Sequence, residues 1–190
     1  MSAALQHPMT QDDFLRWEER QPARYEFDGF LPVAMTGGSV NHAVIQANLV
    51  RHLGNRLDSG PCRVFGSDLK IAVADAIRYP DAFVVCGPLR GKDNIVPNPV
   101  VVFEILSPST QGTDLIRKNR EYRATPSIQR YVILQQDQQA ATVFSRRDDL
   151  WVADILTGEA ILSMPEIGVD LPLADCYRGV EFPPPEPDEA

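Results

Sequence analysis

The chain has 190 residues, of which 44% are hydrophobic and 23% are charged, and its formal net charge is −8. This length fits one domain with a hydrophobic core, no segment approaches the roughly 20 apolar residues of a membrane-spanning helix, and the first residues do not form a secretory signal, so we expect a cytoplasmic protein. The negative charge argues against a nucleic-acid partner without excluding one, because the local field at a site decides binding.

The N-terminal third shows three local patterns. Thr10 can cap a short helix, with Asp13 three residues on as the second half of a capping box. Residues 24–33 are typical of a β-hairpin with its turn at Asp28-Gly29. Apolar residues recur at helical spacing from Ser39 to Leu57, which predicts a long helix capped by Ser39.

The rest of the chain alternates strand and helix patterns. The run 100–106 is almost wholly apolar and β-branched, as expected of a central strand buried on both faces. A helix is predicted from Thr113 to about Thr125. The other predicted strands are 62–65, 69–73 and 82–86, a hairpin of 131–134 with 142–145, and a hairpin of 151–156 with 160–164. This order predicts an α/β fold with a mixed central sheet flanked by helices and added β-hairpins, formed by a single domain over 1–182, with a disordered proline-rich acidic tail at 183–190.

Three cysteines, Cys62, Cys86 and Cys176, lie far apart without a CxxC motif. Their odd number and spacing argue against a disulfide framework or a zinc site. We expect all three to be small buried hydrophobic side chains in a reducing compartment.

Two carboxylates lie within or directly before predicted strands. Glu104 lies inside the central strand, where an isolated charge must be paired, bound to metal or neutralised; alternatively, it escapes to solvent or pairs with an arginine. Asp81 follows a proline and directly precedes the strand 82–86. Carboxylates at the ends of neighbouring strands can converge, and their oxygens suit Mg²⁺ or Mn²⁺. If the two acids face each other, one of them should have a raised pKa.

The helix after Glu104 carries the next candidates. Asp114, Lys118 and Tyr122 follow each other at intervals of four, so they line one helix face. The alternative is a surface ion pair of about 0.3–0.5 kcal/mol. The same helix carries three arginines, which could bind phosphate or form a solvated face: Arg117, Arg120 and Arg123.

Several motifs together resemble a known family. The strings YEFDG, RYPDAFVV and VVFEILSPST, followed by D-x-x-x-K-x-x-x-Y, look like the large bacterial family of restriction-endonuclease-like proteins in the PD-(D/E)XK nuclease superfamily. The resemblance runs from about Met9 to about Arg146 and implies a restriction-endonuclease-like core of a mixed sheet with helices on both sides.

The resemblance also implies roles for individual residues. Asp81 and Glu104 would be the acids of the motif and would hold the metal together with the backbone carbonyl of Ile105. Leu106 occupies the position of the motif's usual lysine, and Lys118 in the following helix would replace it. Two further positions match the family and are secondary candidates: Glu26 and His42.

The function implied is that of a Mg²⁺- or Mn²⁺-dependent endonuclease that hydrolyses phosphodiester bonds, with DNA as the favoured nucleic-acid partner. The alternative is a catalytically inactive nuclease fold that serves as a binding or assembly module, which the missing lysine at Leu106 and the acidic charge support. A third possibility is that the acids are structural. Because cutting both strands of a duplex needs two sites, we also expect a homodimer or larger homo-oligomer.

Overall fold

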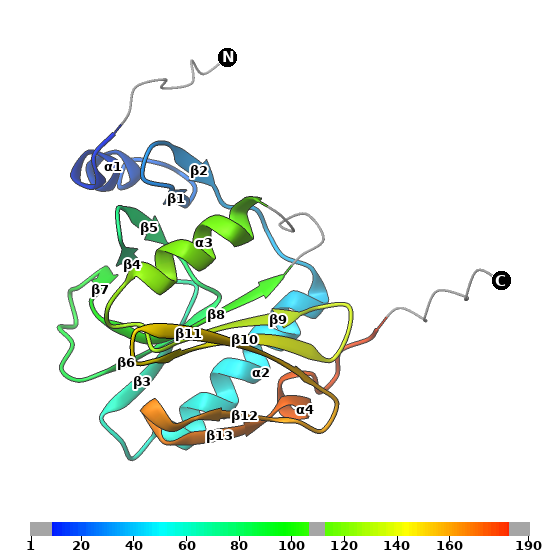
Figure 1. Cartoon of the computed structure of the whole chain (residues 1–190). Coiled ribbons are helices and arrows are strands. Elements are labelled where there is room, and N and C mark those ends of the chain that lie inside the picture. Colours follow the sequence, from blue (N-terminus) through cyan, green and yellow to red (C-terminus); the bar gives the residue numbers. More distant parts are fainter. Residues whose placement is uncertain (1–8, 107–112, 183–190) are drawn as a thin grey trace.

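A computed structural model describes residues 9–106 and 113–182 of the chain, and its N-terminal elements follow the local sequence signals (Figure 1). Helix α1 (Gln11–Glu18) begins with the capping box of Thr10 and Asp13. Strands β1 (Tyr25–Phe27) and β2 (Pro32–Ala34) form the predicted hairpin, in which Gly29 has φ +88° and Asp28 accepts hydrogen bonds from two backbone N–H groups of the turn. The capped helix and the hairpin are therefore confirmed.

The centre of the molecule is a six-stranded mixed sheet. Its strand order is β11-β10-β9-β8-β6-β3, and β8 pairs parallel to β9 but antiparallel to β6. The strands are β3 (Cys62–Gly66), β6 (Ala82–Cys86), β8 (Pro99–Leu106), β9 (Arg130–Gln135), β10 (Ala140–Arg147) and β11 (Leu150–Thr157). The predicted mixed sheet, with the 100–106 run as a central strand, is confirmed.

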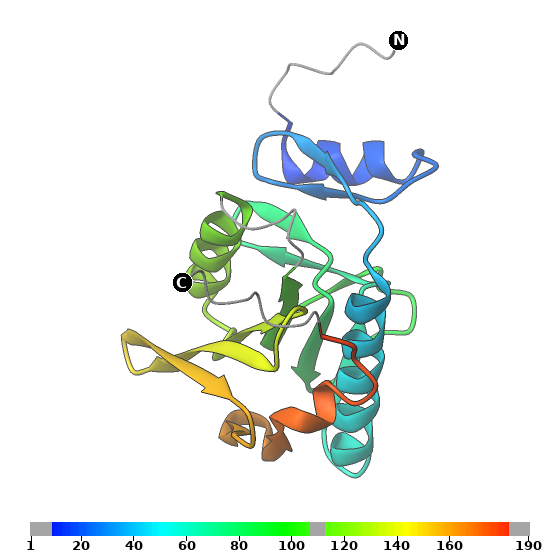
Figure 2. The same cartoon turned by 90° about the vertical axis from the view of Figure 1, so that its right-hand side faces the viewer.

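Helices cover both faces of this sheet, as the views in Figures 1 and 2 agree. Helix α2 (Val40–Leu57) packs on one face, where Leu49 and Leu53 meet inward residues such as Phe103. Helix α3 (Thr113–Ala124) lies on the other face, where Tyr122 packs with residues that alternate with the first set, such as Val102. The two cores are separated by the sheet, so side chains on α2 and α3 approach β8 from opposite sides.

A second sheet connects the N-terminal hairpin to the α3 side. It has five strands in the order β2-β1-β5-β4-β7. Its further strands are β4 (Lys70–Val73), β5 (Ala76–Arg78) and β7 (Ile95–Val96). The short strands β5 and β7 were not predicted, because two or three residues are too few to show a period.

The predicted hairpin of 151–156 with 160–164 is wrong. Strand β11 pairs over its full length with β10, from Ala140 opposite Thr157 to Arg147 opposite Leu150. Strand β12 (Ile161–Met164) pairs instead with β13 (Val169–Pro172), to which the 3₁₀ turn Pro165–Ile167 connects it, and β13 continues into the short helix α4 (Leu173–Cys176). The chain leaves the large sheet after Thr157, and a pairing of eight residues outcompetes the local hairpin.

The prediction for two of the cysteines is also wrong. Cys62 and Cys86 form a disulfide. They are 24 residues apart in sequence, but the antiparallel register of β3 and β6 puts them directly opposite each other, with 3.9 Å between the Cα atoms. Cys176 is buried and free, as predicted, and burial raises the pKa of its thiol to about 12.

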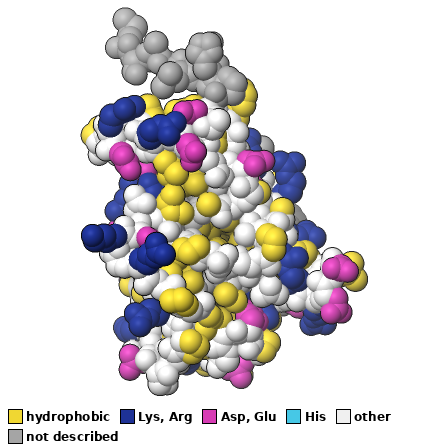
Figure 3. Space-filling view, turned by 90° about the vertical axis from the view of Figure 1, so that its left-hand side faces the viewer, with side chains coloured by type: hydrophobic (Ala, Val, Ile, Leu, Met, Phe, Trp, Pro, Cys, Tyr) yellow, Lys and Arg dark blue, Asp and Glu magenta, His cyan; other side chains and the backbone are white. Residues whose placement is uncertain are grey.

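None of the helices in the described ranges is long and apolar enough to cross a membrane. On the face drawn in Figure 3, acidic and basic side chains are interspersed, and hydrophobic side chains form a strip between them. The net charge of −8 therefore does not give a uniformly acidic surface.

Candidate active site

Glu104 points from the central strand β8 toward α3. Its side chain is 11% exposed, because β8 is paired on both sides and covered by a helix. The hydroxyl of Tyr122 donates a 2.6 Å hydrogen bond to Glu104 Oε1, and Lys118 Nζ lies 3.3 Å from the same oxygen. Glu104 therefore neither escapes to solvent nor pairs with an arginine, and the helical spacing of Lys118 and Tyr122 brings both to one carboxylate.

Asp81 directly precedes β6 and lies next to the C-terminal end of β8. Its Oδ2 accepts a 2.7 Å hydrogen bond from the backbone N–H of Ile105, and its Oδ1 lies 3.1 Å from Nε2 of His42 on α2. The register that pairs Ala82 with Phe103 explains this contact, because Ile105 lies beyond the paired part of β6 and its N–H needs another acceptor. The N–H and the C=O of one strand residue point to the same side, so the Ile105 carbonyl also faces the side of Asp81.

Glu26 belongs to a buried ion network that ties β1, β5 and α3 together. Its Oε1 accepts a hydrogen bond from the backbone N–H of Tyr79 at 3.1 Å. Its Oε2 lies 3.0 Å from Nη1 of Arg78 and 3.3 Å from Nζ of Lys118. Arg78, which is 1% exposed, also binds both carboxylate oxygens of Glu121 on α3. The network thus holds Lys118 over Glu104.

These groups line one cavity of about 540 Å³. Its walls include Glu26, His42, Asp81, Glu104, Ile105 and Lys118. The segment between β2 and α2 closes one side of the cavity. A Cβ on Gly38, in this segment, would lie only 2.9 Å from the ring of His42, so a larger residue would clash with the histidine. Six predicted residues, which come from β1, α2, the position before β6, β8 and α3, therefore meet in one place.

Burial and the neighbouring charges change the ionisation of Glu104. Burial raises the pKa of Glu104 most strongly, Lys118 lowers it, and Asp81 and Glu26 raise it again, so that it reaches about 7. The prediction of one raised carboxyl pKa is confirmed, with burial rather than the neighbouring charges as the largest cause. The contact with Asp81 raises the pKa of His42 against the opposing effect of burial.

The donor set fits a hard divalent cation. Two carboxylates and a backbone carbonyl are oxygen ligands of the kind that Mg²⁺ and Mn²⁺ prefer, and the raised pKa of Glu104 marks negative charge that a cation would stabilise. Within residues 9–106 and 113–182, no group of three His, Cys, Asp or Glu side chains could hold a metal ion by itself. A metal held by Asp81 and Glu104 would take a further donor from the backbone, such as the carbonyl of Ile105.

The structure does not bring the arginines of α3 to this cavity. Arg117 forms an ion pair with Asp28 of the hairpin turn. Arg120 and Arg123 line a separate groove. The side chain of Asp114 lies outside the described part of the structure.

Two residues near the site were not predicted. Gln46 donates a 2.8 Å hydrogen bond to the backbone carbonyl of Asp81 and a 3.0 Å hydrogen bond to Ser67. It follows His42 by four residues on α2, and this helical spacing was a usable signal. The role of Arg78 could not be predicted from local sequence patterns, because its two carboxylate partners, Glu26 and Glu121, are 52 and 43 residues away in sequence.

Known proteins resemble this chain in sequence and in fold. Residues 11–174 match the Uma2 family, whose description reads "Putative restriction endonuclease". "Uncharacterized protein slr1290" of Synechocystis sp. (strain ATCC 27184 / PCC 6803 / Kazusa) is 35% identical over 179 residues, which cover 92% of this chain and 94% of that protein. "Uncharacterized protein sll1609" of the same strain is 29% identical over 165 residues, which cover 84% of this chain and 93% of that protein.

A solved structure shares the fold. The crystal structure of "a putative nuclease belonging to DUF820" from Anabaena variabilis ATCC 29413 superposes on this chain with a TM-score of 0.73 at 20% sequence identity. The superposition covers 90% of this chain and 98% of the Anabaena chain. The resemblance found in the motifs and the predicted restriction-endonuclease-like fold are thereby confirmed. The chain belongs to the Uma2 family of restriction-endonuclease-like proteins.

Proposed function

We propose that the protein is a Mg²⁺- or Mn²⁺-dependent endonuclease that hydrolyses phosphodiester bonds of DNA. The observation that carries the proposal is the convergence of Asp81, Glu104, Ile105 and Lys118 in one cavity, with Glu104 buried and in contact with the Lys118 ammonium. Membership of a family whose description reads "Putative restriction endonuclease" supports a nuclease function.

The side chains of the cavity suggest a division of roles. Asp81, Glu104 and the carbonyl of Ile105 would hold the metal, which when bound polarises the phosphate and lowers the pKa of a water molecule. The contacts with His42 and with the Ile105 N–H fix the orientation of the Asp81 carboxylate.

Lys118 would act on the substrate itself. Its ammonium lies 3.3 Å from both Glu104 Oε1 and Glu26 Oε2, so it is held at the cavity wall. From there it can donate a hydrogen bond to the attacking water or to a phosphate oxygen on which charge develops. Glu26, fixed by Arg78 and by the Tyr79 N–H, is then the residue that positions this lysine.

The place of Lys118 answers the main objection to activity. Leu106 stands where the motif's usual lysine would be, which favoured an inactive binding or assembly module. An ammonium reaches Glu104 from α3 instead, and this pairing of a carboxylate with a lysine supports the active enzyme over the inactive module.

A plasmid-nicking assay in millimolar Mg²⁺ or Mn²⁺ tests the proposal. We expect each site substitution to lower the cleavage rate by about 100-fold or more. The site variants are Asp81→Asn, Glu104→Gln and Lys118→Met, and the matched controls at exposed positions are Asp93→Asn, Glu159→Gln and Lys92→Met.

The outcomes separate the competing functions. Cleavage that is lost in the three site variants and kept in the three controls supports the endonuclease. A wild-type protein that binds DNA but cuts nothing with either metal supports the inactive module. Cleavage that persists in all variants would show a contaminating nuclease and contradict the roles given above.

A further inference from the structure

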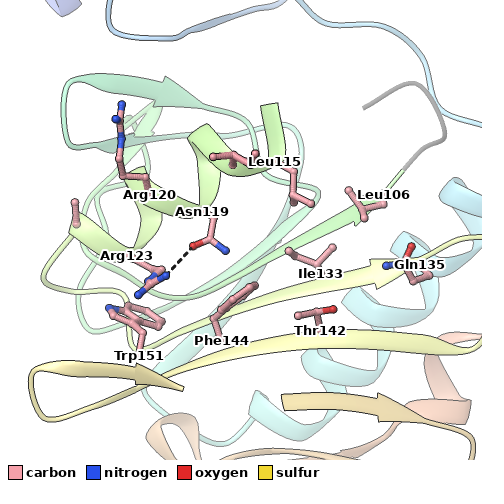
Figure 4. A pocket seen from close by; sticks show the side chains of 12 residues that line it. Leu106, Leu115, Asn119, Arg120, Arg123, Ile133, Gln135, Thr142, Phe144 and Trp151 are labelled. Carbon is pink, nitrogen blue, oxygen red and sulfur yellow. Dashed lines mark hydrogen bonds between the residues drawn. The ribbon is translucent and has the colours of Figure 1, made fainter. Parts of the chain in front are cut away.

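A second cavity, of about 760 Å³, lies between α3 and the strands β9, β10 and β11. Its lining is mainly apolar and aromatic and includes Ile133, Phe144 and Trp151. Figure 4 shows Phe144 and Trp151 along the strands, Arg123 on the helix beside Trp151, and the side chain of Arg120 extending from the helix away from both rings. We call this cavity the α3 groove.

The α3 groove has a local charge opposite to that of the whole chain. The sequence has 26 acidic and 18 basic residues, excluding histidine, yet none of the 12 residues that line the groove is acidic and two are arginines. Within the described ranges, neither Arg120 nor Arg123 forms an ion pair with a carboxylate. The guanidinium of Arg123 lies 5.8 Å from the ring centre of Trp151 and 3.5 Å from Oδ1 of Asn119, and the guanidinium of Arg146 lies 4.7 Å from the same ring centre. Both cations are therefore available to an anion.

The α3 groove adjoins the acidic cavity. Leu106 and Leu115 line both. Tyr131, on the wall of the acidic cavity, stacks on Phe144 of the groove with ring centres 5.9 Å apart. The α3 groove therefore lies next to the cavity that holds Lys118.

We infer that the α3 groove binds an unpaired polynucleotide segment next to the bond that is cut. Its bases lie against Phe144 and Trp151, and its phosphates meet Arg120 and Arg123. Aromatic side chains next to cationic ones suit a single strand, because unpaired bases can stack on the rings while the phosphates bind the cations. A base inside a duplex is already stacked on its neighbours and has no free face for an aromatic ring. The position of the cut bond rests on the proposed function; the binding of the strand does not.

Fluorescence of Trp151 tests the inference directly. The chain has two tryptophans, so Trp17→Phe leaves Trp151 as the only reporter. The titration uses this variant with Glu104→Gln in EDTA, so that neither metal nor cleavage takes part. The probes are a single-stranded oligodeoxynucleotide, a single-stranded oligoribonucleotide and a blunt DNA duplex. We expect at least one single strand to quench Trp151 and the duplex to leave it unchanged.

Groove variants then separate phosphate contacts from base contacts. Arg120→Ala and Arg123→Ala should each reduce the slope of log K against log[salt] by about 0.7, which is the effect of one lost phosphate contact. Phe144→Leu should weaken binding by roughly fivefold or more and leave the slope unchanged. Arg90→Ala removes the same charge at an exposed position away from the groove and should bind like the parent. Alanine favours helices, so the α3 variants keep their fold.

Three results would overturn the inference: no quenching by either single strand, equal quenching by the duplex, or arginine variants that bind like Arg90→Ala. Quenching by only one of the two single strands assigns the groove to that nucleic acid. A protein that binds a strand in this way but never cuts contradicts the proposed function and leaves the inference intact. A protein that cuts while its groove variants bind normally contradicts the inference alone.

Discussion

Lys118 Nζ lies 3.3 Å from Glu104 Oε1, and the two residues come from different elements, α3 and β8. The lysine of the site thus reaches the buried carboxylate from a packed helix rather than from its own strand. This arrangement makes the charge state of Glu104 depend on α3, on Asp81 and on a bound cation, and several measurable consequences follow from that dependence.

Metal should stabilise the wild type through Glu104. At a hundredfold excess over its Kd, Mn²⁺ should add about 2.7 kcal/mol, which raises the melting temperature by roughly 5–10 °C in a protein of this size. Glu104→Gln removes a ligand charge and should respond little, whereas the exposed control Glu159→Gln should respond like the wild type. Thermal melts in EDTA and in Mn²⁺ measure this. Equal responses of all three proteins would leave Glu104 as a structural residue.

In EDTA, Glu104 should lower stability as pH rises. Burial first, and then the neighbouring acids, raise its pKa from 4.5 to about 7 in the folded protein. The folded state therefore binds more protons than the unfolded state between these values, so stability falls as pH rises from about 4.5 to 7 and is level above.

The difference in unfolding free energy between wild type and Glu104→Gln isolates this contribution. The unfolding free energy of the wild type should fall relative to that of Glu104→Gln as pH rises from about 4.5 to 7. At pH 8 the metal-free variant should be no less stable than the metal-free wild type. Urea titrations at several pH values give the difference. A wild type that gains stability over Glu104→Gln as pH rises would show that Lys118 outweighs burial.

Arg78→Met should destabilise the fold strongly. The substitution leaves Glu26 and Glu121 as buried carboxylates without their guanidinium, which typically costs about 3–5 kcal/mol. Adding Glu121→Gln to this variant should recover part of the loss, because it removes one of the two stranded charges. Denaturant titration of the single and double variants tests the coupling; losses that simply add would mean that the network does not act as a unit.

The protein should form a homodimer or a larger symmetric assembly. Two strands of a duplex need two sites, and two-fold oligomers are the commonest kind. Light scattering at micromolar concentration should give a mass of at least about twice the 21.1 kDa of the chain. A mass near that of one chain would contradict the prediction.

Much of the architecture was visible in the sequence because local free energies decide it. The capping pattern of Thr10, the helical period of Ser39–Leu57 and the apolar run that became β8 reflect interactions between residues a few positions apart. The motifs around Asp81 and Glu104 likewise pointed to the family and to the acids, since their spacing follows the strand and helix lengths of the fold.

Only the tertiary structure decided how distant residues meet. The register of β3 on β6 joined Cys62 to Cys86, and the pairing of β11 with β10 overrode the expected hairpin. The register of β6 on β8 gave Asp81 the N–H of Ile105, and the docking of α3 brought Lys118 to Glu104 and Arg78 to Glu121. These contacts depend on strand register and on the packing of whole elements, whose energies are summed over many remote neighbours and leave no local pattern in the chain.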